Sequence, residues 1–150
     1  MAQLGKILLS IVCGVAGFLA VSLWGPFSKD AFDYSSASIE EKQKYLERKA
    51  NNMSRGFKLT AGGSSKISNT YVDAETDLVS LTITLNKSGS IPASELSTAR
   101  NLLMKTACSL TERKLLMETA FKLRLRYFQA NGANLMTVEA NGETCAPYIS

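Results

Sequence analysis

Residues 7–24, ILLSIVCGVAGFLAVSLW, form an uncharged apolar run that constrains this chain more than any other feature. No charged side chain occurs between Lys6 and Lys29, and 18 helical residues at about 1.5 Å each span roughly 27 Å of hydrocarbon. Trp24 and Phe27 follow where an aromatic belt at the membrane interface is expected. The run therefore predicts an uncleaved transmembrane helix. A cleaved secretory signal is the alternative, although its apolar core is usually only about 7 to 15 residues long.

The charges on either side of this run predict its orientation. The amino terminus and Lys6 lie on one side, whereas Lys29, Asp30 and Asp33 sum to minus one on the other. Positive charge stays in the cytoplasm, so the rest of the chain is predicted to lie outside it. The predicted parts are a cytoplasmic N-terminus (1–6), a transmembrane anchor (7–25), a linker (26–37) and an outer domain (38–150).

One stripe of the predicted anchor carries only small side chains, because Ser10, Cys13, Gly14 and Gly17 recur at i, i+3, i+4 and i+7. Membrane helices associate by close packing and hydrogen bonds, so this stripe is a predicted helix-packing face. The alternative is that it has no partner, since glycine is common in membrane spans generally.

The composition excludes several classes of function. The chain has no histidine, which rules out Ser-His-Asp and Cys-His catalysis and every zinc site that needs imidazole. Its net charge of +4 includes no basic cluster dense enough to follow phosphates, so nucleic acid is not expected as a partner. No spacing of serine and lysine singles out a catalytic dyad. We therefore expect a protein that is not an enzyme, with no catalytic residue, no metal site and no cofactor.

Two cysteines, Cys108 and Cys145, lie in the predicted outer domain, where thiols oxidise. A bond between them would close a loop of about 38 residues, which contributes roughly 4 kcal/mol in the chain-entropy model. The pair is predicted to form a disulfide. Two buried free thiols are the alternative.

A helix is predicted from Ile39 to about Arg55. Ser38 and Glu41 have the spacing of a capping box at its start, and Gly56 is a favoured residue just past a helix end. The helix could pair with a partner as a stalk. It offers only about two heptads, so packing on the domain's own sheet is the preferred interpretation.

Two further helices are predicted around Cys108. The first begins near Pro92, and a second capping box, Ser109 with Glu112, starts a shorter one. Helical spacing gives the first of them one apolar stripe: Leu96, Ala99, Leu103 and Ala107.

Strands are predicted at 57–61, 66–72 and 78–85, with a glycine turn at 62–63. The last of these alternates between apolar and polar side chains, which is typical of a half-buried antiparallel strand. Between the last two strands, Asp73, Glu75 and Asp77 lie at alternate positions. These residues lack the glycine and terminal glutamate of an EF-hand loop, so we interpret them as a solvated turn rather than a calcium site.

Residues 121–140 predict a hairpin, because two alternating runs flank Asn131-Gly132, a strong signal for a type I′ turn. A two-residue loop pairs residues whose numbers sum to 263. The apolar pairs are then Tyr127–Met136, Leu125–Val138 and Leu123–Ala140, and the polar pairs include Arg126–Thr137 and Arg124–Glu139.

The polar face of this hairpin carries Lys122, Arg124 and Arg126 at alternate positions. These side chains could bind an anionic ligand or an acidic partner. An ordinary solvated face with one cross-strand ion pair is the alternative.

The layout is an anchor, a short charged helix, a small sheet and a helix-plus-hairpin unit closed by two cysteines. It resembles small membrane-anchored envelope proteins of proteobacteria without assigned activity. Over residues 57–145 it is also similar in layout to the α+β pilotins of type II secretion, although their lipid-attachment signal is missing here. The resemblance carries no motif and transfers no functional residue. It implies an accessory or assembly role in the bacterial inner membrane, with the outer domain in the periplasm.

We therefore expect an α+β fold: one N-terminal transmembrane helix, then a domain with an antiparallel sheet of four or five strands and helices packed on one face. The expected function is protein–protein interaction through the transmembrane helix and the outer domain. Its expected partners are the lipid bilayer and other integral membrane proteins. The alternative is a module that binds an anionic lipid headgroup or cell-wall fragment on the basic strand face.

Overall fold

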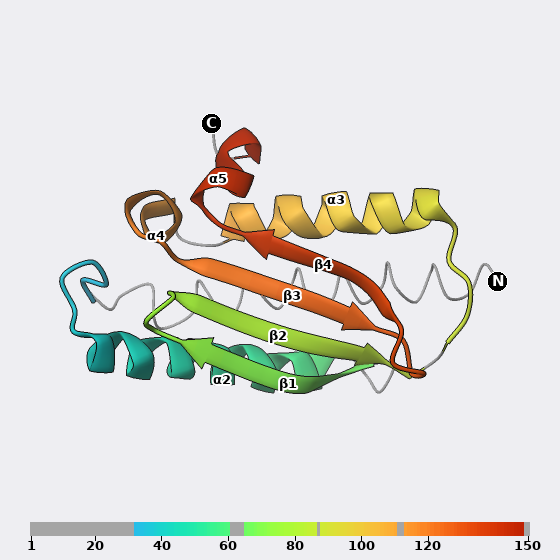
Figure 1. Cartoon of the computed structure of the whole chain (residues 1–150), viewed down its shortest axis with the longest axis horizontal. Helices are drawn as coiled ribbons and strands as arrows, with labels where there is room; N and C mark the ends of the chain where they lie inside the picture. Colours follow the sequence, from blue (N-terminus) through green and yellow to red (C-terminus); the bar gives the residue numbers. More distant parts are fainter. Residues whose placement is uncertain (1–31, 61–64, 87, 111–112, 149–150) are drawn as a thin grey trace.

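The computed structural model describes residues 32–60, 65–86, 88–110 and 113–148. They form an α+β unit with one four-stranded sheet (Figure 1). The elements are α2 (Ile39–Thr60), β1 (Ser65–Asp73), β2 (Leu78–Leu85), α3 (Ala93–Leu110), α4 (Arg113–Glu118), β3 (Lys122–Phe128), β4 (Asn134–Ala140), α5 (Gly142–Cys145) and the 3₁₀ helix η2 (Ala146–Tyr148). The α+β prediction is confirmed.

The predicted anchor at residues 7–24, with its stripe of Ser10, Cys13, Gly14 and Gly17, lies outside the described residues. Within the described ranges, no helix combines the length and the apolar character that crossing a membrane requires.

The sheet is mixed, with strand order β1-β2-β3-β4. β1 and β2 pair antiparallel, as do β3 and β4, but the central strands β2 and β3 are parallel. The prediction of a wholly antiparallel sheet is therefore wrong at its centre. The physical reason is the crossover: α3 and α4 return the chain to the end of the sheet where β2 began, so β3 starts beside Leu78 and runs the same way.

The start of the domain also differs from the prediction. α2 continues through Gly56 to Thr60, so residues 57–60 are helical and do not form a strand. A glycine inside a helix costs only about 1 kcal/mol relative to alanine, a preference that tertiary context often overrides. The described sheet therefore has four strands.

The hairpin of β3 and β4 has the predicted register along most of its length. Its turn, however, has three loop residues and not two. The Gln129 N–H donates to the carbonyl oxygen of Ala133, and Gly132 is in the left-handed region at φ 88°. A type I′ turn also needs a positive φ at Asn131. Asn131 is not among the described residues that have a positive φ. The extra loop residue shifts the register between Tyr127 and Phe128.

The core lies on one face of the sheet, which we call the inner face. Every second residue of β2, β3 and β4 is buried there over most of each strand. α2 contacts β1, and α3 contacts β4 (Figure 1). The predicted stripe of α3 is confirmed in Ala99, Leu103 and Ala107, which are buried. The inner-face core residues of β2, β3 and β4 are Val79, Leu81, Ile83, Leu85, Leu123, Leu125, Tyr127, Met136, Val138 and Ala140.

The first described residues pack onto this unit, although they belong to the predicted linker. The Phe32 ring stacks on Tyr45 of α2 with centroids 4.5 Å apart. The buried Tyr34 hydroxyl donates to the Asp77 carboxylate at 2.6 Å, so the entering chain is tied to the turn between β1 and β2. Lys42 approaches the same carboxylate at 3.9 Å.

Tyr34 and Tyr127 are both buried, but of these two hydroxyls only that of Tyr34 has a hydrogen-bond partner among the described residues. We expect Tyr34→Phe to lower the free energy of unfolding by about 1.5–3 kcal/mol, because a hydrogen bond to a charged group is lost. Tyr127→Phe should leave stability unchanged or raise it by about 1 kcal/mol, because it removes an unpaired buried hydroxyl. Urea unfolding of the two variants at pH 7 measures both effects, and equal losses would contradict the assignment.

The same hydroxyls predict a loss of stability in alkali. Burial raises the pKa of Tyr127, and burial followed by the hydrogen bond to Asp77 raises the pKa of Tyr34. The unfolded chain therefore ionises first, so stability is full below pH 10 and falls above it, by about 1.4 kcal/mol per group at pH 11. Tyr127→Phe should make this alkaline loss smaller by about that amount.

Candidate functional site on the outer face of the sheet

The outer face of the sheet is the side turned away from α2 and α3, and it carries the polar residues that alternate with the core. The strand registers align it into cross-strand rows. One row is Tyr71, Ser80, Arg124 and Glu139; the next is Asn69, Thr82, Arg126 and Thr137; Lys66, Thr84 and Phe128 follow.

Arg124 and Glu139 form the predicted cross-strand ion pair. The Nε and Nη2 of Arg124 donate to one carboxylate oxygen of Glu139 at 3.2 and 3.0 Å. The other carboxylate oxygen accepts from the side-chain amide of Asn141 at 3.0 Å. Both charged side chains remain partly exposed, so the pair contributes little to stability. The ion pair does, however, engage the guanidinium of Arg124 within the chain.

Lys122 is also engaged within the chain. Its Nζ donates to the carbonyl oxygen of Thr76 at 3.0 Å, in the turn between β1 and β2. The structure thus places Lys122, Arg124 and Arg126 on one strand, as predicted, but two of the three contact other groups of the chain. They do not act as three equivalent cations.

Arg126 differs from its two neighbours. It is exposed, and among the described contacts its guanidinium makes neither an ion pair nor a hydrogen bond. The group lies 5.1 Å from the ring centroid of Phe128, two residues along the same face. Its cross-strand neighbours are Thr82 on β2 and Thr137 on β4. The outer face therefore presents one exposed arginine that makes no ion pair or hydrogen bond among the described residues.

Tyr71 adds an aromatic side chain to this face. Its side chain is 51% exposed, and no other strand residue of the described chain is a large hydrophobic as exposed as this. The hydroxyl donates to the Asp73 carboxylate at 3.5 Å. Tyrosine and arginine are enriched at protein interfaces and among their energetically dominant residues.

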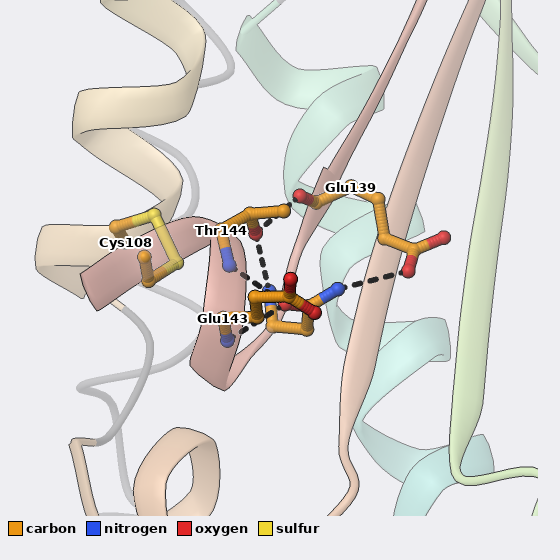
Figure 2. Close-up of a disulfide and its surroundings, with 6 residues drawn as sticks. Cys108, Glu139, Glu143 and Thr144 are labelled. Carbon is orange, nitrogen blue, oxygen red and sulfur yellow. Dashed lines mark hydrogen bonds between the residues drawn. A yellow bond between two sulfur atoms is a disulfide. The ribbon is translucent and has the colours of Figure 1, made fainter. Parts of the chain in front are cut away.

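Cys108 and Cys145 form the predicted disulfide, with a Cα–Cα distance of 5.3 Å. Both residues are buried. The bond fastens α5 to the end of α3, as Figure 2 shows. Asn141 caps α5 by accepting from the N–H groups of Glu143 and Thr144.

This arrangement closes part of the free edge of β4. The Thr144 hydroxyl donates to the carbonyl oxygen of Glu139 at 2.8 Å (Figure 2), and Arg100 of α3 donates to the carbonyl oxygen of Thr137 at 3.3 Å. A partner strand would have to displace both side chains to pair with β4 there. Partners are therefore better accommodated by the outer face than by this edge.

Two of the three carboxylates of the acidic turn between β1 and β2, those of Asp73 and Asp77, accept hydrogen bonds from other groups of the chain. Asp73 accepts from the backbone N–H of Glu75, and Asp77 accepts from Tyr34. In the described ranges, no group of three histidine, cysteine, aspartate or glutamate side chains is placed to hold a metal ion.

A surface pocket of about 490 Å³ lies along α2 next to Phe32. Carboxylates and cations alternate on its wall, so it has no preference for one sign of charge. Its lining residues are Phe32, Glu41, Lys44, Glu47, Arg48 and Asn51.

Sequence reasoning found Arg126 but not its contrast with Lys122, and it missed Tyr71. The alternation of side chains in β3 was the signal for Arg126. Tyr71 lies on β1, whose register shifts between Ile67 and Asn69, so the face on which Tyr71 lies could not be counted from the sequence.

Comparisons with protein-family models, with curated proteins and with solved structures found no match for this chain.

Proposed function

We propose that this chain is a non-catalytic, membrane-anchored accessory subunit of a bacterial envelope complex, and that its folded unit binds a partner protein through the outer face. The observation that carries the proposal is the exposure of Tyr71 and Arg126 on a sheet surface that no described helix packs against.

The chemistry of this surface suits a protein partner. It is a sheet face, several strands wide, that combines an aromatic ring, threonine and asparagine side chains and the exposed cations Lys66 and Arg126. Such mixed surfaces are typical of non-obligate interfaces, in which aromatic and arginine anchors lie within a polar surround. The second contact would be the helix-packing face in the anchor, Ser10, Cys13, Gly14 and Gly17, against another integral membrane protein.

Photocrosslinking in intact membranes tests the proposal. The photoreactive amino acid p-benzoylphenylalanine would replace Tyr71 in the full-length chain, and Asn101, an exposed residue of α3, would serve as the matched control position. We expect a crosslink to a second membrane protein from position 71 and none from position 101. A chain that stays uncrosslinked from position 71 would contradict the proposal.

Binding of an anionic lipid or glycan is the second candidate function, and the exposed guanidinium of Arg126 is the observation that favours it. The engaged side chains of Lys122 and Arg124 count against it, because membrane attraction grows by about 1 kcal/mol for each basic residue near the surface. Binding of soluble glycerol phosphate, which has the headgroup chemistry of phosphatidylglycerol, compares the detergent-solubilised full chain with its Lys122, Arg124 and Arg126→Gln triple variant. Equal affinity would eliminate the lipid headgroup.

A further inference from the structure

We propose that Arg126 is the residue with which the outer face recognises its partner, and that its ligand is a carboxylate on an acidic surface of that partner protein. This inference rests on the proposed function and names the chemistry of the partner.

Two neighbouring rungs of the hairpin, the cross-strand pairs Arg124–Glu139 and Arg126–Thr137, differ in charge. Arg124 faces Glu139 across the strands and binds its carboxylate, whereas Arg126 faces Thr137, which has no charge. The two arginines are on the same strand and the same face, but only Arg124 has a charged residue opposite it on β4. The second rung lacks the carboxylate that the first one has, and a partner can supply it.

The surroundings of Arg126 prepare its guanidinium for that contact. The Phe128 ring lies near the guanidinium, which restricts the side chain and still leaves N–H groups available. Arginine binds carboxylates through two parallel hydrogen bonds, a geometry that a compact lysine ammonium does not match. The neighbouring threonines, Thr82 and Thr137, add hydroxyl donors on both sides of the same row.

The charge of the face agrees with an acidic partner. Its basic residues are Lys66, Lys122, Arg124 and Arg126, whereas Glu139 and the nearby Asp73 are acidic. The balance is therefore positive by two, since four cations face two carboxylates. Opposite charge on the partner would guide association and its register, with a dependence on salt.

Zero-length crosslinking tests the contact itself. Arg126→Lys places a primary amine at this position, and a water-soluble carbodiimide couples an amine to a carboxylate with loss of water, forming an amide. In membranes that contain the full chain, we expect mass spectrometry to find the introduced amine joined to an aspartate or glutamate of a second protein. Asn101→Lys, with the same new amine on α3, should give no such product. Coupling only to this chain's own Glu139 would overturn the proposal.

A second measurement separates this inference from the proposed function. In the chain that carries the photoreactive residue at position 71, Arg126→Gln should lower the yield of the crosslink about tenfold, and Lys122→Gln should not change it. An unchanged yield with Arg126→Gln would overturn the carboxylate contact and leave docking on the outer face in place. No crosslink in any variant would reject the docking itself. If Arg126→Gln left the crosslink unchanged and reduced only the binding of soluble glycerol phosphate to the detergent-solubilised full chain, the ligand would be a phosphate and the proposal would be wrong.

Discussion

Replacing Cys108 and Cys145 together by alanine is expected to lower the free energy of unfolding by about 4 kcal/mol. The bond closes a loop of about 38 residues, and without it the unfolded chain regains the conformational freedom of that loop. A small domain has a total stability of only about 5–15 kcal/mol, so the loss would be a large share. Urea unfolding of the purified full-length chain, followed by far-ultraviolet circular dichroism, measures it.

The two single variants provide the control for this prediction. Cys108→Ala and Cys145→Ala should each lose about as much stability as the double variant, because either one abolishes the same bond. A loss below about 1 kcal/mol in the double variant would contradict the chain-entropy account for this domain. We also expect the hydrogen bond from Thr144 of α5 to the carbonyl oxygen of Glu139 at the edge of β4 to weaken, because the disulfide no longer holds α5 to α3.

Local pattern was enough to predict the register of β3 and β4. Strict alternation fixes which side chains share a face, and a turn signal between two runs limits the possible pairings to very few. The observed pairs of Leu125 with Val138 and of Arg124 with Glu139 follow from those two facts. The error was confined to the turn, where one extra loop residue is absorbed next to Phe128.

The parallel pairing of β2 with β3 could not be predicted in the same way. A strand covered on one face alternates whether its neighbour runs parallel or antiparallel, so the pattern of Leu78–Leu85 carries no information on direction. Direction is decided by the path of the chain through α3 and α4 between the two strands. That path depends on packing between distant segments.

The candidate site could be predicted in part, because part of it follows from the local pattern of the hairpin. The cross-strand partners of Arg124 and Arg126 follow from the hairpin register, so the occupied rung and the open rung were accessible from the sequence. The contact of Lys122 with the Thr76 carbonyl was not, because it joins the start of β3 to the turn between β1 and β2, 46 residues earlier in the chain. Tyr71 depends on the irregular register of β1.

Leu125→Ala is expected to lower the free energy of unfolding by about 2–5 kcal/mol. Leu125 is 1% exposed on the inner face of β3, between Leu81 of β2 and Val138 of β4. Truncation to alanine removes buried methyl groups and leaves a cavity that surrounding residues fill only partly. The control is Arg126→Ala, at the next residue of the same strand, which should change stability by no more than about 0.5 kcal/mol.

Urea unfolding of both variants under the same conditions measures the difference between the two faces of β3. Similar losses from Leu125→Ala and Arg126→Ala would mean that the outer face is packed within this chain, and the docking surface would have to be sought elsewhere. The expected contrast has a direct use, because a variant of Arg126 that keeps full stability can report only on binding. Any loss of crosslinking it shows then belongs to the partner contact, not to the fold.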